Sequence, residues 1–588
     1  MFQTAGYSGG DQKVRQKAPF MKTKANLLFV ALAPWLGVPI IETVQAGLVE
    51  LAETGNAEPR DTNTFFQIGQ LPTLSEDGKV VFYTDLRNNG LLQGWGVFLA
   101  DGNTVKTVAR TSQPSPDLNG NFYTFNSQVA LNSASQVFEA GLNGTLGGGA
   151  DNSAIYQLSG GALTILARAG QTVPGGGATF RSFTGVTPRM NRSGQTAFEC
   201  ATSSSPYVMY RSTGGVLSQI VYFGQPSPDG NGFLQGLLGD PTINNGGKLA
   251  FPATLSATSS SNYGLYLADE NGLTVLARSG GSAPDGNGKF SSFPSTQLTL
   301  NDSNQIAFVA NLSSTSAGPA DNLGLYRADT RGIVQLVRKS QLVPGGNGRF
   351  LDFGGQSHVA INNAGVVAFL ADLTGTTGGN ADNAAIFLAQ GTALTQVARK
   401  GQHPPDGNGV LSGFGYPALN NNGEIAFVAT LSGTAGGTKD NQGVFFVDSS
   451  LAVKQVIRAG QLFSGKTVSS PNFLDGPNYG GLSGLNDHGQ LAVWSYLNGN
   501  AAVFLWSNSG TPTGLRLFTT APLGKDVSIT FQAVGGTTNF LQAAPSPTGA
   551  FVDIGKLVLP GSGLITTNFA ESGVATNKTR FYRIRQLR

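Results

Sequence analysis

The chain has 588 residues, of which 12% are charged, 40% are hydrophobic and 82 are glycine. This composition argues against disorder, and the length exceeds one ordinary core, so we expect several domains or a repeat architecture. A net charge of +3 excludes an obviously basic nucleic-acid-binding protein, and three histidines with one cysteine leave little material for a zinc or haem site, a disulfide framework or a Cys/His nucleophile pair.

Residues 1–46 have the order of a secretory signal. Lys22 and Lys24 precede an apolar run over residues 27–41, and the segment ends on the small residue Ala46. We predict cleavage near Ala46 and an exported protein, located outside the cell, at its surface or in the periplasm. The alternative is a retained anchor, but the run is shorter than the roughly 20 residues of a spanning helix, and no other stretch is long and apolar enough to span a membrane. Met21 fits an initiator, which makes residues 1–20 an upstream extension.

The charge of the whole chain belongs to this segment. Residues 1–46 hold five basic residues and two acidic ones, so 32 of each sign remain in the rest of the chain. The exported protein is therefore expected to be formally neutral.

One phrase recurs eight times after this segment. Its clearest copy, over residues 361–369, reads Ile-Asn-Asn-Ala-Gly-Val-Val-Ala-Phe, and Asn304 replaces the glycine in another copy. The eight copies lie at residues 75–82, 132–138, 191–198, 244–251, 301–308, 361–369, 419–427 and 486–493. A Gly-Leu-Tyr-Leu-Ala-Asp type of phrase follows each copy, and then a Val-Ala-Arg-Lys-Gly-Gln type, with arginines at Arg110, Arg168, Arg278, Arg338, Arg399 and Arg458. A pattern in three parts that stays in register marks a tandem repeat.

The repeat predicts an all-β fold. Asn in Asn-x-x-Gly suits the first position of a type I turn, and Gly suits the left-handed position that follows. The apolar run after the turn is typical of a strand buried on both faces, with one strand before it, around residues 356–361, and two after it. Each unit of about 58 residues is therefore a four-stranded blade of a β-propeller over residues 47–513.

Ring closure can be predicted from residues 48–53. They resemble the last strand of a repeat unit, the strand that carries the repeated arginine, but they precede the first unit. They could complete the final unit, which ends near Trp506 with a poor fourth strand. We favour eight blades; seven blades with an irregular unit, or an open solenoid, are the alternatives. Residues 514–588 lose the repeat and show short alternating strands, which predicts a small C-terminal β-sandwich.

The Asn-x-x-Gly-x-x-Ala-Phe phrase, over about residues 48–506, resembles the tandem repeat of that name in exported bacterial proteins with a choice of C-terminal anchors. The terminal Phe581-Tyr582-Arg583-Ile584 resembles the end of small β-domains that close large secreted proteins of verrucomicrobial-type bacteria. The resemblance implies export and a repeat fold, and it carries no catalytic residues to transfer. The chain departs from members with a Pro-Glu-Pro-type anchor, because no apolar helix with a basic tail follows.

Repeated Pro-Asp-Gly-Asn-Gly loops are the first candidate site. Asp and Asn oxygens in a glycine-rich loop suit calcium, although the loops lack the run of carboxylates and the distant Glu of a complete calcium loop. Asp-Gly and Asn-Gly are equally the residues that tight turns require, and residues 343–347 keep the loop without its Asp. The calcium candidates are Asp117, Asn119, Asp229, Asn231, Asp285, Asn287, Asp406 and Asn408.

Two further repeated features have structural and functional interpretations. Asp-Asn pairs precede the third strand of four units and either cap loops or present oxygen ligands or sugar contacts; they begin at Asp151, Asp321, Asp382 and Asp440. The repeated arginines either pair with a neighbouring Asp or loop carbonyl, or form a ring for anionic polysaccharide.

The histidine, cysteine and tryptophan residues give weaker indications of a site than the repeated features do. His358, His403 and His488 fall at non-equivalent points of the repeats, which indicates surface positions rather than a lyase or hydrolase site. Cys200 takes the place of a small interblade Ala and is expected to be buried and inert. Trp95, Trp494 and Trp506 could stack on sugars, but the last two lie in strand phrases and fit the core better.

We therefore predict an exported, non-enzymatic propeller that binds a glycan, cell-surface material or a protein. The alternative is a secreted polysaccharide lyase or glycosidase, whose site would be a polar cluster at the propeller mouth that breaks the repeat symmetry. A structural role in a surface layer or matrix is the third interpretation. No cofactor other than calcium is indicated.

Overall fold

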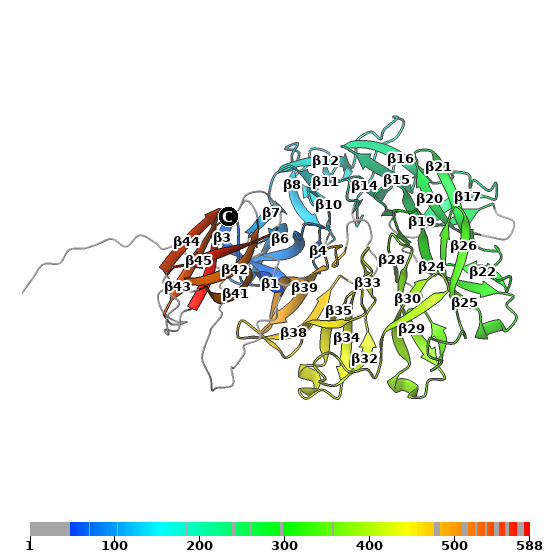
Figure 1. The fold of residues 1–588 in the computed structure, drawn as a ribbon. Coiled ribbons are helices and arrows are strands. Elements are labelled where there is room, and N and C mark those ends of the chain that lie inside the picture. The colour runs from blue at the N-terminus through cyan, green and yellow to red at the C-terminus, as the bar shows by residue number, and fades with distance from the viewer. Residues whose placement is uncertain are drawn as a thin grey trace, which may run out of the picture. The chain divides into compact units, whose positions relative to one another are not determined.

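The computed structural model describes residues 47–587 apart from the segments 70, 103, 127, 184, 238–240, 258–261, 295–297, 355–357, 475–482, 509–515, 524–525, 535–537, 546–551, 559–563 and 573–580. The predicted signal segment lies outside the described residues. The chain divides into two compact units, one over Glu42–Pro512 and the other containing Thr513–Arg588. The first unit is a β-propeller of eight antiparallel sheets arranged around a channel (Figure 1).

The first four blades follow the chain from residue 57 to residue 278. Their strands are, in blade 1, β2 (Ala57–Glu58), β3 (Asp61–Ile68), β4 (Thr73–Leu74), β5 (Val80–Asn88), β6 (Leu91–Asp101) and β7 (Thr104–Arg110); in blade 2, β8 (Asn121–Phe125), β9 (Ala130–Leu131), β10 (Ser135–Asn143), β11 (Ser153–Ser159) and β12 (Ala162–Arg168); in blade 3, β13 (Arg189–Met190), β14 (Thr196–Cys200), β15 (Val208–Thr213) and β16 (Val216–Tyr222); and in blade 4, β17 (Phe233–Leu237), β18 (Thr242–Ile243), β19 (Leu249–Ser256), β20 (Tyr263–Asp269) and β21 (Gly272–Arg278).

The last four blades repeat this order, and the final one includes β1. Their strands are, in blade 5, β22 (Lys289–Ser292), β23 (Thr299–Leu300), β24 (Ile306–Ser313), β25 (Leu323–Asp329) and β26 (Gly332–Arg338); in blade 6, β27 (Arg349–Asp352), β28 (Val359–Ile361), β29 (Val367–Thr374), β30 (Ala384–Gln390) and β31 (Ala393–Arg399); in blade 7, β32 (Val410–Phe414), β33 (Ala418–Leu419), β34 (Ile425–Ser432), β35 (Gln442–Val447) and β36 (Val453–Arg458); and in blade 8, β37 (Leu462–Phe463), β38 (Lys466–Phe473), β39 (Gln490–Leu497), β40 (Asn500–Ser507) and β1 (Leu48–Glu53).

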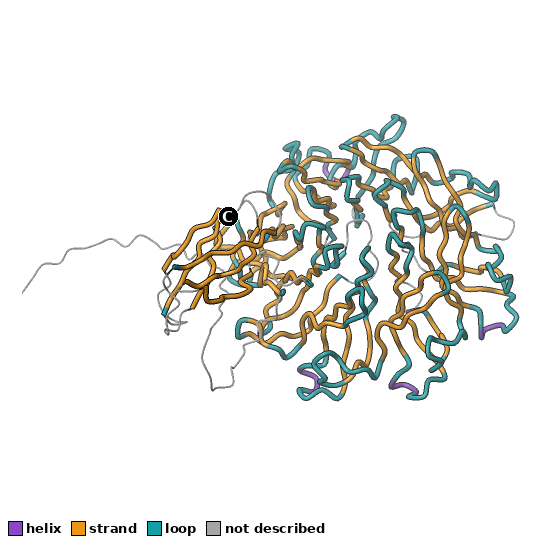
Figure 2. Tube along the Cα trace, in the orientation of Figure 1, coloured by secondary structure: helices purple, strands orange, loops and turns teal. Residues whose placement is uncertain are grey.

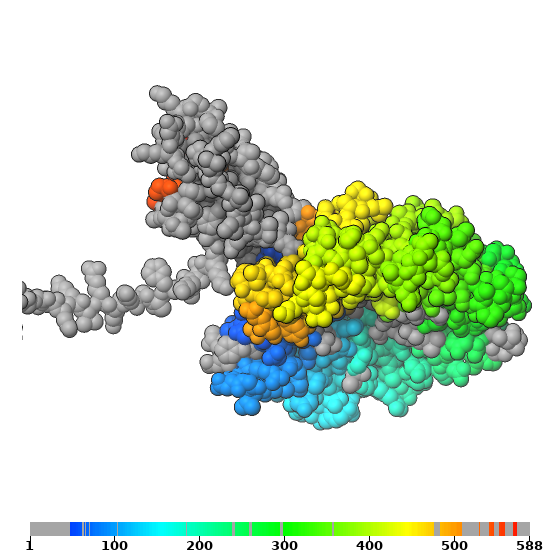
Figure 3. Space-filling view, turned by 90° about the horizontal axis from the view of Figure 1, so that it is seen from below, coloured from blue at the N-terminus to red at the C-terminus, as the bar shows by residue number. Residues whose placement is uncertain are grey.

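Closure of the ring occurs where the sequence predicts it. Strand β1 pairs antiparallel with β40, with Leu48 opposite Trp506 and Glu53 opposite Ala502. Figure 3 shows the first blade, in blue, beside the last, in orange. Eight blades are therefore correct, and neither the seven-bladed nor the open alternative applies.

In six of the eight blades, the first strand differs from the prediction because it is divided into two strands. In blade 6 we expected one strand around residues 356–361, but the chain pairs with β29 at two places, through β27 and through β28. The inner pieces β9, β13, β18, β23, β28 and β33 contact one another in turn around the channel, and Figure 1 shows β4, β28 and β33 near its centre. The Asn turns that follow these pieces are thereby brought to one end of the channel.

Aromatic pairs fill the space between neighbouring blades. The Phe of each Ala-Phe phrase faces an aromatic residue of the next strand in seven blades, with ring centroids 5.6–6.0 Å apart and planes 17–28° apart. Phe369 is fully buried in a cluster that contains Leu325 of blade 5 and Phe387 of its own blade. Cys200 is buried in the cluster between blades 2 and 3, as predicted. The small residues and aromatic rings of the repeat are thus interblade packing.

The C-terminal unit consists of two three-stranded sheets. One contains β41 (Arg516–Leu523), β42 (Asp526–Val534) and β45 (Leu564–Glu571), and the other contains β44 (Val552–Val558), β43 (Thr538–Ala544) and β46 (Phe581–Leu587). The ring of Phe569 on the first sheet lies so close to Gly555 on the second that a β-carbon there would be 2.3 Å from it. The two sheets therefore pack face to face.

Strands dominate both units. Among the described residues, helical structure is limited to short 3₁₀ turns, drawn in purple in Figure 2. No helix in the described part of the chain is long and apolar enough to cross a membrane.

Candidate binding site at the mouth of the propeller channel

The Asn turns form a chain of hydrogen bonds that runs around the channel from blade 2 to blade 1. We call their first residues the Asn ring: Ser75, Asn132, Asn191, Asn244, Asn301, Asn362, Asn420 and Asn486. The Nδ2 of each Asn donates to the backbone carbonyl of the ring residue in the next blade, at 2.8–3.4 Å. The last of these bonds, from Asn486 to Ser75, joins blade 8 to blade 1.

Each Asn also holds its own turn, as predicted. The Oδ1 of Asn362 accepts from the backbone N–H groups of Ala364 and Val366 at 3.1 and 3.0 Å, and Gly365 has a φ of 74°. Asn304, which replaces the glycine, has a φ of 60°, a conformation that Asn tolerates. The sequence predicted this capping role but not the contact between blades, because the turn pattern is local and the contact is not.

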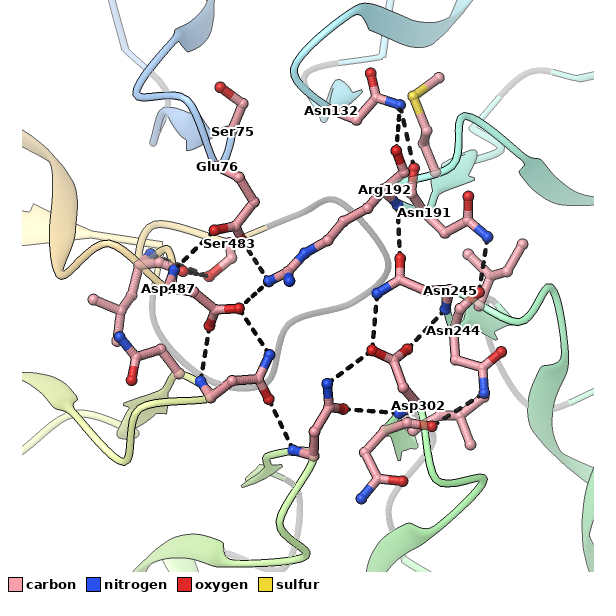
Figure 4. A pocket seen from close by; sticks show the side chains of 18 of the residues that line it. Ser75, Glu76, Asn132, Asn191, Arg192, Asn244, Asn245, Asp302, Ser483 and Asp487 are labelled. Atoms are coloured by element: carbon pink, nitrogen blue, oxygen red, sulfur yellow. Dashed lines mark hydrogen bonds and ion pairs between the residues drawn. The ribbon is translucent and has the colours of Figure 1, made fainter. Parts of the chain in front are cut away.

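A second ring lies directly inside the first. It consists of the residues that follow the Asn ring in sequence: Glu76, Ser133, Arg192, Asn245, Asp302, Asn363, Asn421 and Asp487. From Arg192 round to Glu76, the backbone N–H of each member donates to a side-chain oxygen of the next, at 2.8–3.0 Å. Their side chains are therefore fixed in position at one end of the channel, which we call the mouth (Figure 4).

The second ring is interrupted at Ser133, because the side chain of the next member, Arg192, has no acceptor. Here Lys79 of blade 1 donates its Nζ to the Ser133 carbonyl at 2.5 Å. The side chain of Arg192 lies over the same gap and crosses to blades 1 and 8. Its Nη2 donates to Glu76 Oε1 at 2.6 Å and also to Asp487 Oδ2.

The mouth encloses a polar cavity of about 200 Å³ lined by residues from all eight blades. Three carboxylates (Glu76, Asp302 and Asp487) and one guanidinium (Arg192) belong to the second ring. Burial raises the pKa of Glu76, and the adjacent Asp487 carboxylate raises it further. Burial opposes ionisation of Asp487 too, but hydrogen bonds from Asn421 and Arg192 bring its pKa below the usual value.

Sequence reasoning anticipated polar convergence at the centre of the ring but did not name these residues. The signal was available inside the repeat itself. The position after the ring Asn changes from blade to blade among Glu, Ser, Arg, Asn and Asp, whereas the ring position before it is Asn in seven of the eight units. A variable polar position within a constant phrase is where a repeat protein places its specific contacts.

The Pro-Asp-Gly-Asn-Gly loops lie away from the mouth and are fastened to the last strand of their own blade. In blade 7, Arg458 Nη1 donates to both Asp406 oxygens at 2.8 and 2.7 Å, and Nη2 donates to the Asn408 carbonyl at 2.8 Å. Nε of the same arginine donates to the Asp440 carbonyl at 2.9 Å. The predicted pairing of the repeated arginines with an Asp and with loop carbonyls is confirmed.

The predicted calcium candidates all belong to such loops. Arg168, Arg278, Arg338 and Arg458 pair with Asp117, Asp229, Asp285 and Asp406 respectively. The side chains of Asn119, Asn287 and Asn408 donate to Asp151, Asp321 and Asp440, and Asn231 presents its carbonyl to Arg278. No group of three or more His, Cys, Asp or Glu residues suited to a metal occurs in the described part of the chain. Calcium binding by these loops stays a prediction.

The Asp of each Asp-Asn pair caps its loop. Asp440 Oδ2 accepts from the Gly436 backbone N–H at 3.1 Å, and its Oδ1 accepts from the Thr434 hydroxyl at 2.5 Å. The same carboxylate accepts from Asn408, so the loop is tied to the neighbouring Pro-Asp-Gly-Asn-Gly loop. These contacts agree with the capping interpretation.

The remaining candidates are dispersed. His488 lies at the mouth with its Nδ1 3.7 Å from Glu76, whereas His358 stacks on Tyr416 and His403 bonds the Gly409 carbonyl on an exposed loop. Trp506 is buried beside Phe446, and Trp494 packs beside Tyr496. Trp95 packs against the cluster between blades 1 and 2. The tryptophans therefore belong to the core rather than to a sugar-binding surface.

Solved structures share the propeller architecture at low similarity. A prolyl endopeptidase matches with 10% identity and a TM-score of 0.35, covering 80% of this chain and 54% of that one, so the chain spans about half its length. The β-propeller domain of the trilobed protease from Pyrococcus furiosus matches with 11% identity and a TM-score of 0.31, covering 59% and 90%. The polysaccharide lyase Uly1 matches with 8% identity and a TM-score of 0.32, covering 66% and 92%.

Sequence comparison gives a family. No curated protein matches the chain. A model described as a family of unknown function (DUF7453) matches twice in succession, over residues 5–208 and 207–512, and so covers the whole propeller. This match does not test the resemblance to exported proteins with Asn-x-x-Gly-x-x-Ala-Phe repeats and a choice of anchor, which stays a prediction. The chain belongs to the DUF7453 family of unknown function.

Proposed function

We propose that the protein is an exported, non-enzymatic binding scaffold that takes its ligand at the mouth of the propeller channel. The observation that carries this proposal is the second ring, which presents side chains from all eight blades around one polar cavity. The ligand class is a glycan, cell-surface material or a protein. Export rests on the signal pattern of residues 21–46.

Three properties of the mouth support binding. Its side chains are held by hydrogen bonds to the neighbouring blade, so little conformational entropy is lost when a ligand orders them. The cavity is lined by amide, carboxylate and guanidinium groups, which give orientation and specificity to a polar ligand. The residue type at the lining position changes between blades, so the surface is asymmetric although the scaffold is symmetric.

A variant that fills the mouth tests the proposal. Ser133 is exposed in the cavity, and its side chain takes no part in the second-ring bonds, so Ser133→Trp should block the cavity and leave the rings intact. We expect the wild-type protein to bind ligands on glycan or peptide arrays, and we expect this variant to lose that binding. Arg331→Trp is the matched control, because that side chain is 79% exposed and does not line the cavity. Ligand binding that Ser133→Trp leaves unchanged would contradict the proposal.

A carbohydrate-active enzyme at the same mouth is the second candidate function. One observation favours it: Glu76, with a raised pKa, and Asp487, with a lowered pKa, share the cavity and both contact Arg192. Two carboxyl groups whose pKa values are pushed in opposite directions are the kind of pair that glycoside hydrolysis uses. Turnover of a polysaccharide that is lost in Glu76→Gln would establish this function. Inactivity against a broad panel of neutral and anionic polysaccharides would exclude it.

A further inference from the structure

The side chain of Arg192 is not needed for the second ring. Its backbone N–H already makes the standard bond of the ring, to Asn245 Oδ1 at 2.9 Å. The side chain turns the opposite way and reaches residues of blades 1 and 8, far from its own blade in sequence. It is 42% exposed, and the following Ser193 is exposed as well. The guanidinium can therefore leave the mouth without opening the hydrophobic core.

The groups that Arg192 contacts form a site for a cation. Glu76 Oε1 and Asp487 Oδ2 both accept from its Nη2, and their carboxylates are 24% and 20% exposed. Asp302 lies across the cavity, where its oxygens accept from Asn245 and Asn363 (Figure 4). Arg192 is the one cation in the second ring, all of whose members the structure describes. Once its guanidinium swings out, three carboxylates face the cavity, and a cation is the ligand that they favour.

The size of the cavity limits that ligand. With the Arg192 side chain in place the space is about 200 Å³, below the range of pockets that hold a drug-sized molecule; a ligand group that replaces this side chain would fill the space that it leaves, which suits one long cationic side chain. The charge is also local, because the chain outside residues 1–46 has 32 acidic and 32 basic residues. A cationic side chain entering the mouth is therefore attracted by the mouth itself and not by the protein as a whole.

We propose that the mouth binds the guanidinium or ammonium group of a peptide side chain, and that Arg192 occupies this place as an internal competitor when no ligand is present. This inference rests on the proposed function and specifies its ligand. Because ligand and Arg192 compete for the same carboxylates, the apparent affinity is reduced by the fraction of molecules in which Arg192 fills the site. Removing the Arg192 side chain should therefore strengthen binding.

Isothermal titration of the full chain with the blocked peptide Gly-Arg-Gly, and with Gly-citrulline-Gly as a neutral analogue of the same shape, tests this competition. We expect Arg192→Ala to bind the arginine peptide at least tenfold more tightly than the wild-type protein and to bind the citrulline peptide weakly. Arg192→Lys should bind the arginine peptide more weakly than Arg192→Ala does, because it keeps an internal cation. Adding Glu76→Gln to Arg192→Ala should remove most of the gain. A thermal melt of each variant shows that it is folded.

The possible results of this titration distinguish a cation site from a ligand site of another kind at the mouth. If Arg192→Ala melts as a folded protein and binds the arginine peptide no better than wild type does, Arg192 only closes the gap at Ser133 and the inference is wrong. If the citrulline peptide or a neutral glycan binds equally well and Ser133→Trp abolishes that binding, the mouth is a ligand site but not a cation site. Binding of a glucosamine oligomer in place of the arginine peptide would overturn the choice of a peptide.

Discussion

At the scale of single residues, Glu139 couples the stability of the ring to pH. Its side chain lies between blades 2 and 3 and is 4% exposed; burial raises its pKa to about 8, which the Gly185 backbone N–H offsets only in part. In the unfolded state the same carboxyl has a pKa near 4.5, so the folded state holds the proton more tightly. The free energy of unfolding therefore falls as pH rises from about 4.5 to 8. We expect urea unfolding of Glu139→Gln to lose this slope and to show about 2–4 kcal/mol more stability at pH 8.

The control for this measurement is the corresponding residue of blade 3. Glu199 occupies the same strand position but is only partly buried, so Glu199→Gln should leave most of the slope in place. A Glu139→Gln protein whose unfolding free energy still falls by the full wild-type amount between pH 5 and 8 would show that another group carries the effect.

A second residue-scale prediction concerns the Phe of the repeat. Phe369 is fully buried, and its ring lies 5.7 Å from that of Phe387 at the interface with blade 5. Phe369→Ala should leave a cavity between blades and lower the free energy of unfolding by about 3–5 kcal/mol. Leu351→Ala, at a side chain that is 44% exposed in the same blade, should change it by less than about 0.5 kcal/mol. Equal effects of the two substitutions in a urea titration would disprove the interblade role.

At the scale of elements, the arginine of each last strand fastens two loops to its blade. Arg458 is 4% exposed and reaches both Asp406 and the Asp440 carbonyl, so Arg458→Ala should release residues 404–409 and 434–440 together. We expect faster hydrogen exchange at the Gly407 and Gly437 amides and a loss of about 1–3 kcal/mol.

Blade 6 offers the matched comparison, because it has glycine where the other loops have Asp. Arg399 contacts the Asn347 and Asp382 carbonyls and has only a longer ion pair, 3.4 Å to the Asp382 carboxylate, with no Asp in its Pro-Gly-Gly-Asn-Gly loop. Arg399→Ala should therefore cost less than Arg458→Ala. If both variants lose the same stability, the carbonyl contacts and not the ion pair hold the loops.

The strands and turns of the propeller could be predicted from the sequence, but the contacts at the mouth could not, for a physical reason. Strand number, turn type and closure through residues 48–53 follow from hydrophobic alternation and from Asn-x-x-Gly, which are local properties. The contacts of Arg192 with Glu76 and Asp487 join residues 116 and 295 positions apart in the sequence, and no local pattern reports them. The division of the first strand was missed although the sequence marks it: in blade 6 the residues between the two pieces, 353–358, are glycine-rich and mostly polar.

At the scale of the whole propeller, one short strand from the N-terminal side completes the last blade. Strand β1 covers β40 from Trp506 to Ala502, and the side chain of Glu53 pairs with Lys466 of the same blade. A chain that lacks residues 47–53 would expose the backbone N–H and C=O groups of β40, which are a template for pairing with a second copy. We expect this truncated protein to unfold at a lower temperature and to form concentration-dependent oligomers in size-exclusion chromatography with light scattering.

Adding the missing strand in trans makes this prediction specific. A synthetic peptide of residues 47–56 should bind the truncated protein, restore the monomer and raise its melting temperature with the logarithm of peptide concentration, because it binds the folded state alone. The same peptide with Pro at position 49 cannot complete the ladder and should have no effect. Since Leu48 contributes to the interface between blades 7 and 8 and Ala52 to that between blades 8 and 1, rescue should need both ends of the strand. Full rescue by residues 50–56 alone would mean that edge pairing, and not interblade packing, closes the ring.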